Sequence, residues 1–141
     1  MGWSQIQIIA ATGGTALHEG RAMRFGEVVT DSAKVIKGSV FVALKGERHD
    51  GHRFLPDALR RGASCVIVHR DLRGLNLGGS AVVKVRDTLR ALGDLAHYRR
   101  EQLNPKVLAI TGSNGKTTTK EMVAAILDTA ILDGERLRGK V

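Results

Sequence analysis

Apolar residues of the chain fall into short runs separated by polar, glycine-rich connections. In the run 39–45 (SVFVALK), Val40 and Val42 share one face of an extended segment and Phe41 and Ala43 share the other, so both faces are apolar. Such a strand belongs in a sheet that is covered on both sides. Comparable runs predict further strands at 24–30, 65–69 and 81–85.

Helical patterns flank these strands. Ser4 and Gln7 fit a capping box at the start of a helix over 4–11, which a pair of glycines ends. Residues 54–61 predict a second helix, again closed by a glycine. The alternation of strands and short helices over residues 1–86 favours a small α/β domain.

The pattern changes at Asp87, which can cap a longer helix that Asn104 and Pro105 end. This helix is expected to open a second domain, residues 87–141. Its apolar residues recur at three- and four-residue spacing, as in an amphipathic helix: Leu89, Leu92, Leu95 and Ala96.

Residues 107–111 (VLAIT) predict a short buried strand, which a glycine-rich loop joins to a helix over 117–127. Strand, glycine loop and helix in this order begin a parallel α/β unit, and we expect the parallel neighbours of the strand to come from further chain. The side chains expected to point inward from the helix are Met122, Val123, Ile126 and Leu127.

The loop GSNGKTTT, residues 112–119, has the composition of a triphosphate-binding loop. Its two glycines let backbone N–H groups approach an oxyanion, and the helix N-terminus adds partial positive charge. Lys116 can reach the β- and γ-phosphates, and the Thr117 hydroxyl can ligate Mg²⁺. The alternative is a turn that merely joins a strand to a helix. The general motif has glycine where this chain has Ile110, so the loop departs from that motif.

The net charge of +8 and the isoelectric point near 10.3 make nucleic acid a partner to consider. The 22 Lys and Arg residues are scattered, however, with no run longer than the pairs Arg60-Arg61 and Arg99-Arg100. Aromatic residues that could stack bases are not interleaved with them. We therefore expect no nucleic-acid partner.

No apolar run approaches the roughly 20 residues of a membrane span, and the N-terminus lacks the pattern of a secretory signal. We expect a cytoplasmic protein without a membrane partner. Cys65 lies in the apolar run SCVIV and is expected to be a buried, reduced thiol. His49 and His52 have no Cys or third ligand beside them, which argues against a metal site there.

The segment TGSNGKTT, residues 111–118, resembles the phosphate loop of the Mur ligase family and its folylpolyglutamate synthetase relatives, in which this form replaces the general one. The continuation TKEM (119–122) and the upstream segment TDSAKVIKGSVFVALKGERHDGHRF (30–54) are similar to one branch. That branch adds D-alanyl-D-alanine to UDP-N-acetylmuramoyl-tripeptide. The resemblance runs in register from about residue 4 to about residue 128.

The resemblance implies an ATP-dependent amide ligase of peptidoglycan precursor synthesis. ATP phosphorylates the terminal carboxylate of the tripeptide, and the amino group of D-alanyl-D-alanine attacks the acyl phosphate, releasing ADP and phosphate. It also implies that residues 1–86 form the N-terminal domain that binds the UDP-substrate. Residues 87–141 then begin the central phosphate-loop ATPase domain, a parallel α/β fold that binds ATP and Mg²⁺.

The family's binding residues can be carried over position by position. Asp31 and Ser32 match an Asp-Ser-Arg segment beside the UDP moiety, but Ala33 replaces the Arg, so that charged contact is absent or is supplied by Lys34. The residues that match the loop approaching the uridine are Lys45, Gly46, Asp50, Gly51 and His52. Those that match the ATP site are Thr111, Gly112, Ser113, Asn114, Gly115, Lys116, Thr117 and Thr118, with Thr117 also on Mg²⁺.

Beyond Leu127 the sequence DTAILDGERLRGKV departs from the family, whose chain continues into the rest of the ATPase domain. We therefore expect an N-terminal portion without a complete catalytic set, and no ligase activity from these 141 residues alone. Two alternatives stay open: the neighbouring Mur ligase that adds the third amino acid, and a non-catalytic module that binds UDP-muramoyl-peptide.

Overall fold

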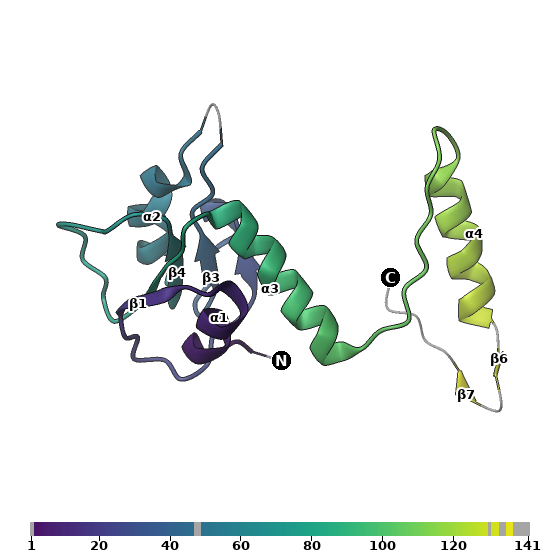
Figure 1. Ribbon diagram of the computed structural model, residues 1–141, viewed down its shortest axis with the longest axis horizontal. Helices are drawn as coiled ribbons and strands as arrows, with labels where there is room; N and C mark the ends of the chain where they lie inside the picture. Colours follow the sequence, from purple (N-terminus) through teal and green to yellow (C-terminus); the bar gives the residue numbers. More distant parts are fainter. Residues whose placement is uncertain (1, 47–48, 130, 133–134, 137–141) are drawn as a thin grey trace. The chain divides into compact units, whose positions relative to one another are not determined.

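The computed structural model describes residues 2–46, 49–129, 131–132 and 135–136 (Figure 1). By internal contacts the chain divides into two units, Met1–Asn104 and Pro105–Val141. Within the described residues, none of the helices combines the length and the apolar character needed to cross a bilayer.

The first unit contains a five-stranded sheet with the strand order β1-β5-β4-β3-β2. Strands β2 to β5 pair in parallel, and β1 pairs antiparallel to β5. The carboxyl ends of the parallel strands therefore meet at one edge of the sheet. The strand bounds are β1 Thr15–His18, β2 Val28–Val29, β3 Val40–Val42, β4 Cys65–Val68 and β5 Ala81–Lys84.

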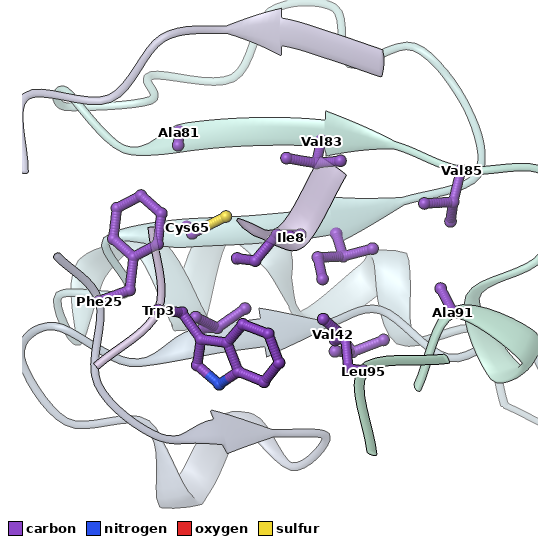
Figure 2. Close-up of a cluster of buried hydrophobic side chains, with 12 residues drawn as sticks. Trp3, Ile8, Phe25, Val42, Cys65, Ala81, Val83, Val85, Ala91 and Leu95 are labelled. Atoms are coloured by element: carbon purple, nitrogen blue, oxygen red, sulfur yellow. The ribbon is translucent and has the colours of Figure 1, made fainter. Parts of the chain in front are cut away.

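Helices cover both faces of this sheet. One face packs against Ile8 of α1 and against Ala91 and Leu95 of α3, and the other packs against Leu55 and Ala58 of α2. Figure 2 shows the first of these two cores. The helix bounds are α1 Gln5–Thr12, α2 Leu55–Arg60 and α3 Thr88–Leu103, with short 3-10 turns η1 Ser32–Lys34 and η2 Gly51–Phe54.

Alternate residues of β3 enter the two cores, as the pattern of the run 39–45 predicts. Val40 and Val42 lie in the core with α1 and α3, and Phe41 and Ala43 lie in the core with α2. All four side chains are 0% exposed, which confirms that both faces of this strand are covered. Cys65 is equally buried, and its burial raises the thiol pKa to about 12, so the thiol stays protonated and inert.

The predicted helix ends are confirmed in detail. The Ser4 hydroxyl accepts a hydrogen bond from the Gln7 N–H at 3.2 Å, and Gln7 Oε1 accepts one from the Ser4 N–H at 3.0 Å. Asp87 caps α3 by accepting from the N–H groups of Leu89 and Arg90. The buried face of α3 differs from the predicted one. Leu95 is buried as expected, but Leu89 is 64% exposed and Ala91 is buried instead.

Two strands differ from the sequence prediction. The strand expected at 24–30 is shorter in the structure, where only β2 joins the sheet. Phe25, at the start of the expected strand, pairs instead with Trp3 in an isolated bridge. Strand β1 was not predicted, and its four side chains are all exposed, so it has no apolar alternation to reveal it. Its pairing with β5 comes from backbone hydrogen bonds, which every sequence can make.

The second unit contains α4 Lys116–Thr129 and a short antiparallel pair, β6 Ile131–Leu132 with β7 Glu135–Arg136. The strand predicted at 107–111 is wrong for this chain, since residues 105–115 form no strand. A strand requires a hydrogen-bonded neighbour, and no strand of the described residues pairs with this segment.

The inward orientation predicted for α4 is not found either. Met122, Ile126 and Leu127 are 61%, 62% and 40% exposed, whereas Val123 is half-buried. An apolar helix face is buried only where a sheet or another helix packs on it, and the described part of this unit supplies no such layer. The last residues of the tail, 137–141, lie outside the described residues.

Helix α3 groups with the first unit by contact, because it packs on α1 and on the sheet. The domain boundary expected between residues 86 and 87 concerns the functional domains of the family and stays a prediction.

The capping box gives a direct stability test. Replacing Ser4 by Ala removes the acceptor for the Gln7 N–H, so the free energy of unfolding should fall by about 1 kcal/mol. Ser4→Asp keeps an oxygen acceptor and is the matched control. Urea unfolding followed by the fluorescence of Trp3, the single tryptophan, measures both variants. Equal stability of wild type and Ser4→Ala would contradict the role of the cap.

Candidate functional site

The substrate-binding residues implied by the resemblance follow two neighbouring parallel strands: Asp31 and Ser32 after β2, and Lys45, Gly46, Asp50, Gly51 and His52 after β3. Both segments therefore lie at the carboxyl edge of the sheet. In open α/β sheets this edge is where ligands bind. The fold thus gathers at adjacent strand ends residues that are far apart in the sequence.

The loop after β3 closes back onto the strand. Lys45 forms a β-bridge with Asp50, and the Gly51 N–H donates to the Leu44 carbonyl at 2.7 Å. Lys45 is exposed, and residues 47–48 within the loop lie outside the described residues. The loop is therefore anchored at both of its ends, next to the last residues of the strand.

His52 is the buried anchor of this loop, with a side chain that is 1% exposed. Its Nδ1 lies 2.7 Å from Asp50 Oδ1, and its Nε2 accepts a hydrogen bond from the His69 N–H at 3.3 Å. Since Nε2 is an acceptor, the ring proton lies on Nδ1 and is donated to Asp50. The contacts thus require the neutral imidazole.

Burial and the same contacts set the direction of both pKa shifts. Burial lowers the pKa of His52, although its hydrogen bond to Asp50 opposes the shift. The backbone N–H of His52, bonded to Asp50 Oδ1 at 3.0 Å, is the main cause that lowers the pKa of Asp50. At neutral pH the pair is therefore a carboxylate beside a neutral ring.

Asp31 and Ser32 have local partners. Asp31 Oδ1 accepts from the Ala33 N–H at 2.9 Å and so caps η1. The Ser32 hydroxyl bonds to the Asp57 carboxylate and is the main cause that lowers the pKa of Asp57. Lys34 is exposed at the end of η1, a position open to solvent. Asp31 and Ser32 thus shape the turn after β2.

The edge also carries residues that sequence reasoning missed as site residues. His69 and Arg70 follow β4, and Arg86 follows β5. A cavity of about 610 Å³ is lined by residues that include His69, Lys84 and Arg86. His69 Nδ1 is buried without a hydrogen-bond partner among the described residues. The signal available was position, since Arg70 and Arg86 come directly after the strands predicted at 65–69 and 81–85, and His69 is the last residue of the first of them.

The second candidate site is the loop 111–118, whose residues are all exposed. Gly115 has φ +76°, a left-handed conformation that favours glycine, and α4 starts at the next residue. Lys116 Nζ donates to the Gly112 carbonyl at 2.5 Å and lies 3.4 Å from the Ser113 carbonyl. The ammonium group is therefore folded over the loop.

These features fit a bound triphosphate and Mg²⁺. The first-turn N–H groups of α4 have no intrahelical acceptors, and Lys116 is the first residue of this helix. The Thr117 side chain is exposed, and Thr117 lines a cavity of about 290 Å³ with Ile110 and Lys116 among its other residues. The donor set is one cation, free N–H groups and a hydroxyl, which suits phosphate oxygens and a hard cation.

Comparisons with known proteins assign the chain to a family. The family model described as "Mur ligase family, catalytic domain" matches residues 24–100, more than half of the chain. The model described as "Mur ligase middle domain" matches residues 110–138. The chain belongs to the Mur ligase family.

Individual Mur ligases resemble this chain over most of its length. It is 41% identical over 109 residues to the UDP-N-acetylmuramoyl-tripeptide--D-alanyl-D-alanine ligase of Haemophilus influenzae, which covers 77% of this chain and 23% of that protein. The structure of UDP-N-acetylmuramoylalanyl-D-glutamyl-2,6-diaminopimelate--D-alanyl-D-alanyl ligase from Acinetobacter baumannii superimposes with a TM-score of 0.81 at 40% identity. That match covers 90% of this chain and 28% of the structure.

A third relative is a solved structure with a nucleotide. The MurF ligase from Thermotoga maritima in complex with ADP has a TM-score of 0.62 and 38% identity, covering 72% of this chain and 23% of that one. This Mur ligase chain therefore spans about a quarter of the length of the relatives that it matches.

The neutral state of His52 predicts a pH dependence of stability. In the unfolded chain His52 binds a proton below about pH 6.5, whereas its lowered pKa in the folded state resists protonation. The unfolded state thus binds more protons in this window, so the free energy of unfolding should fall as the pH drops from 7.5 to 5.5.

Urea unfolding across that range should show a flatter pH dependence for His52→Asn than for wild type, because asparagine does not titrate. His97→Gln, at an exposed position on α3, is the control and should keep the slope of wild type. The contribution of Asp50 does not interfere, since it is lost only below the ordinary carboxyl pKa of about 3.9. A slope unchanged in His52→Asn would overturn this prediction.

Proposed function

We propose that this chain is the N-terminal portion of a Mur ligase that adds D-alanyl-D-alanine to UDP-N-acetylmuramoyl-tripeptide. The proposal is supported mainly by the 41% identity to a relative of that name over 77% of the chain. The two candidate sites also support it. Such a reaction needs one site that binds the nucleotide sugar and one loop that binds ATP, and the chain has a candidate for each.

The carboxyl edge of the first unit is proposed to hold the UDP end of the substrate. Lys45, Lys34 and Arg70 are exposed there and can attract the diphosphate, while the turn after β2 is fixed by Asp31. Because the loop after β3 is anchored at both ends, its exposed groups are held ready for a ligand.

The phosphate loop of the second unit is proposed to hold ATP and Mg²⁺. When bound, they supply the phosphoryl group that turns the peptide carboxylate into an acyl phosphate, a far better electrophile for an amine. Lys116 would leave the carbonyls of the loop and bind phosphate oxygens instead. Thr117 would offer its hydroxyl to the cation, and the first-turn N–H groups of α4 would orient the phosphates.

Separate titrations of the two ligands test this assignment. In calorimetry the 141-residue protein should bind UDP-N-acetylmuramoyl-tripeptide whether or not ATP is present. Lys116→Ala removes the charged donor at the phosphates, so ATP affinity should fall roughly tenfold or more, with sugar-nucleotide affinity unchanged. Lys106→Ala, an exposed lysine before the loop, is the matched control.

Each arm has a clear negative result. Failure of the wild type to bind the UDP-substrate would refute the role of the first unit. Undiminished ATP binding by Lys116→Ala would refute the role of the loop. Binding of the UDP-substrate with no measurable ATP binding by the wild type would favour the non-catalytic module.

We propose further that the 141 residues do not catalyse the joining reaction by themselves. The chain spans about a quarter of the length of its relatives. Phosphate release should therefore stay at background with ATP, Mg²⁺ and both substrates. ATP-dependent release that requires D-alanyl-D-alanine would refute this prediction.

A further inference from the structure

The hydrogen bonds of His52 connect three segments at the carboxyl edge. Ring atom Nε2 accepts a hydrogen bond from the His69 N–H at the end of β4, and Nδ1 donates one to Asp50 in the loop after β3. It also stacks edge-on against the His69 ring, with centroids 4.2 Å apart. Asp50 in turn pairs through Oδ2 with the Arg70 guanidinium at 3.1 Å.

We propose that His52 is a positioning residue of the UDP-substrate site, which holds Asp50 and thereby Arg70 and the described end of the loop at 49–51, and does not touch the ligand. The inference rests on the proposed function of this edge. It changes the role that the family resemblance implies for His52, from a binding contact to an indirect one.

Burial excludes direct contact. The His52 side chain is 1% exposed, and both ring nitrogens are engaged inside the protein. Arg70, by contrast, has a side chain that is 53% exposed. Arg70, the last residue in this series of contacts, is therefore the one that a ligand can reach.

Arg70 is suited to an anion. Its guanidinium uses one nitrogen for Asp50 and has further N–H donors, in a planar arrangement that matches a phosphate. Anchoring by Asp50 reduces the side-chain freedom that would be lost on binding. The diphosphate of a nucleotide sugar is the chemical group that such a cation recognises.

The loop transmits any displacement of Asp50. A Cβ atom at Gly51 would lie 2.7 Å from the Leu44 carbonyl oxygen, so the loop is pressed closely against the end of β3. Asp50 precedes this contact directly and bridges to Lys45 at the other end of the loop. If the Asp50 carboxylate loses the ring donor of His52, it keeps only the His52 backbone N–H and Arg70 as partners, so this end of the loop is held less firmly.

Two amide variants separate positioning from packing. His52→Asn places an N–H donor where Nδ1 stands and keeps the bond to Asp50. His52→Gln places its amide near the position of Nε2, so it can serve the His69 N–H but loses the donor to Asp50. His97→Gln, exposed on α3, is the control. The readouts are calorimetric affinity for UDP-N-acetylmuramoyl-tripeptide and amide hydrogen exchange at Gly51 and at residue 52, each divided by the intrinsic rate of that variant's sequence.

His52→Gln should weaken substrate affinity about tenfold and speed exchange at both amides, whereas His52→Asn should stay within about twofold of wild type. Unchanged affinity and exchange in His52→Gln would overturn the proposal. Equal losses in both variants, with folding retained, would overturn it in favour of direct contact or packing.

Hydrogen exchange measured without ligand distinguishes a failure of the positioning role of His52 from a failure of the proposed function. If the wild type does not bind the UDP-substrate, the proposed function fails, and the exchange rates alone then decide whether His52 holds the loop. Rates that are the same in His52→Gln and His52→Asn would in that case reject the positioning role as well.

Discussion

The first unit depends on the burial of three central parallel strands on both faces. Every residue of β3 and β4 is 0% exposed, so their backbone groups must be satisfied within the sheet. Parallel pairing also requires each strand to return through a crossover connection, which puts all the carboxyl ends at one edge. The location of the candidate substrate site is a consequence of this pairing.

A buried polar link then gives that edge a defined shape. The His52 side chain is buried, and its two nitrogens have partners only in one protonation state and one tautomer. An imidazole fixed in this way specifies the position of Asp50, and through it that of Arg70. Hydrogen bonds in the interior thus set the place of a charge at the surface.

The second unit follows a different rule, because its loop geometry is local. Gly115 with positive φ, the start of α4 and the fold of Lys116 over the Gly112 carbonyl involve only residues within a few positions of each other. The strand before the loop is not local, since it exists only when neighbours pair with it. Hence the described residues contain a formed loop and helix without the strand at 107–111.

The sequence by itself determined the features that rest on nearby residues or on periodicity: the capped ends of α1 and α3, the two apolar faces of β3, and the phosphate loop. The tertiary structure alone decided the rest. It placed the exposed strand β1 beside β5, and it turned His52 inward and brought Arg70 to the same edge. These features depend on hydrogen bonds between distant segments, and such bonds leave no period or spacing in the sequence.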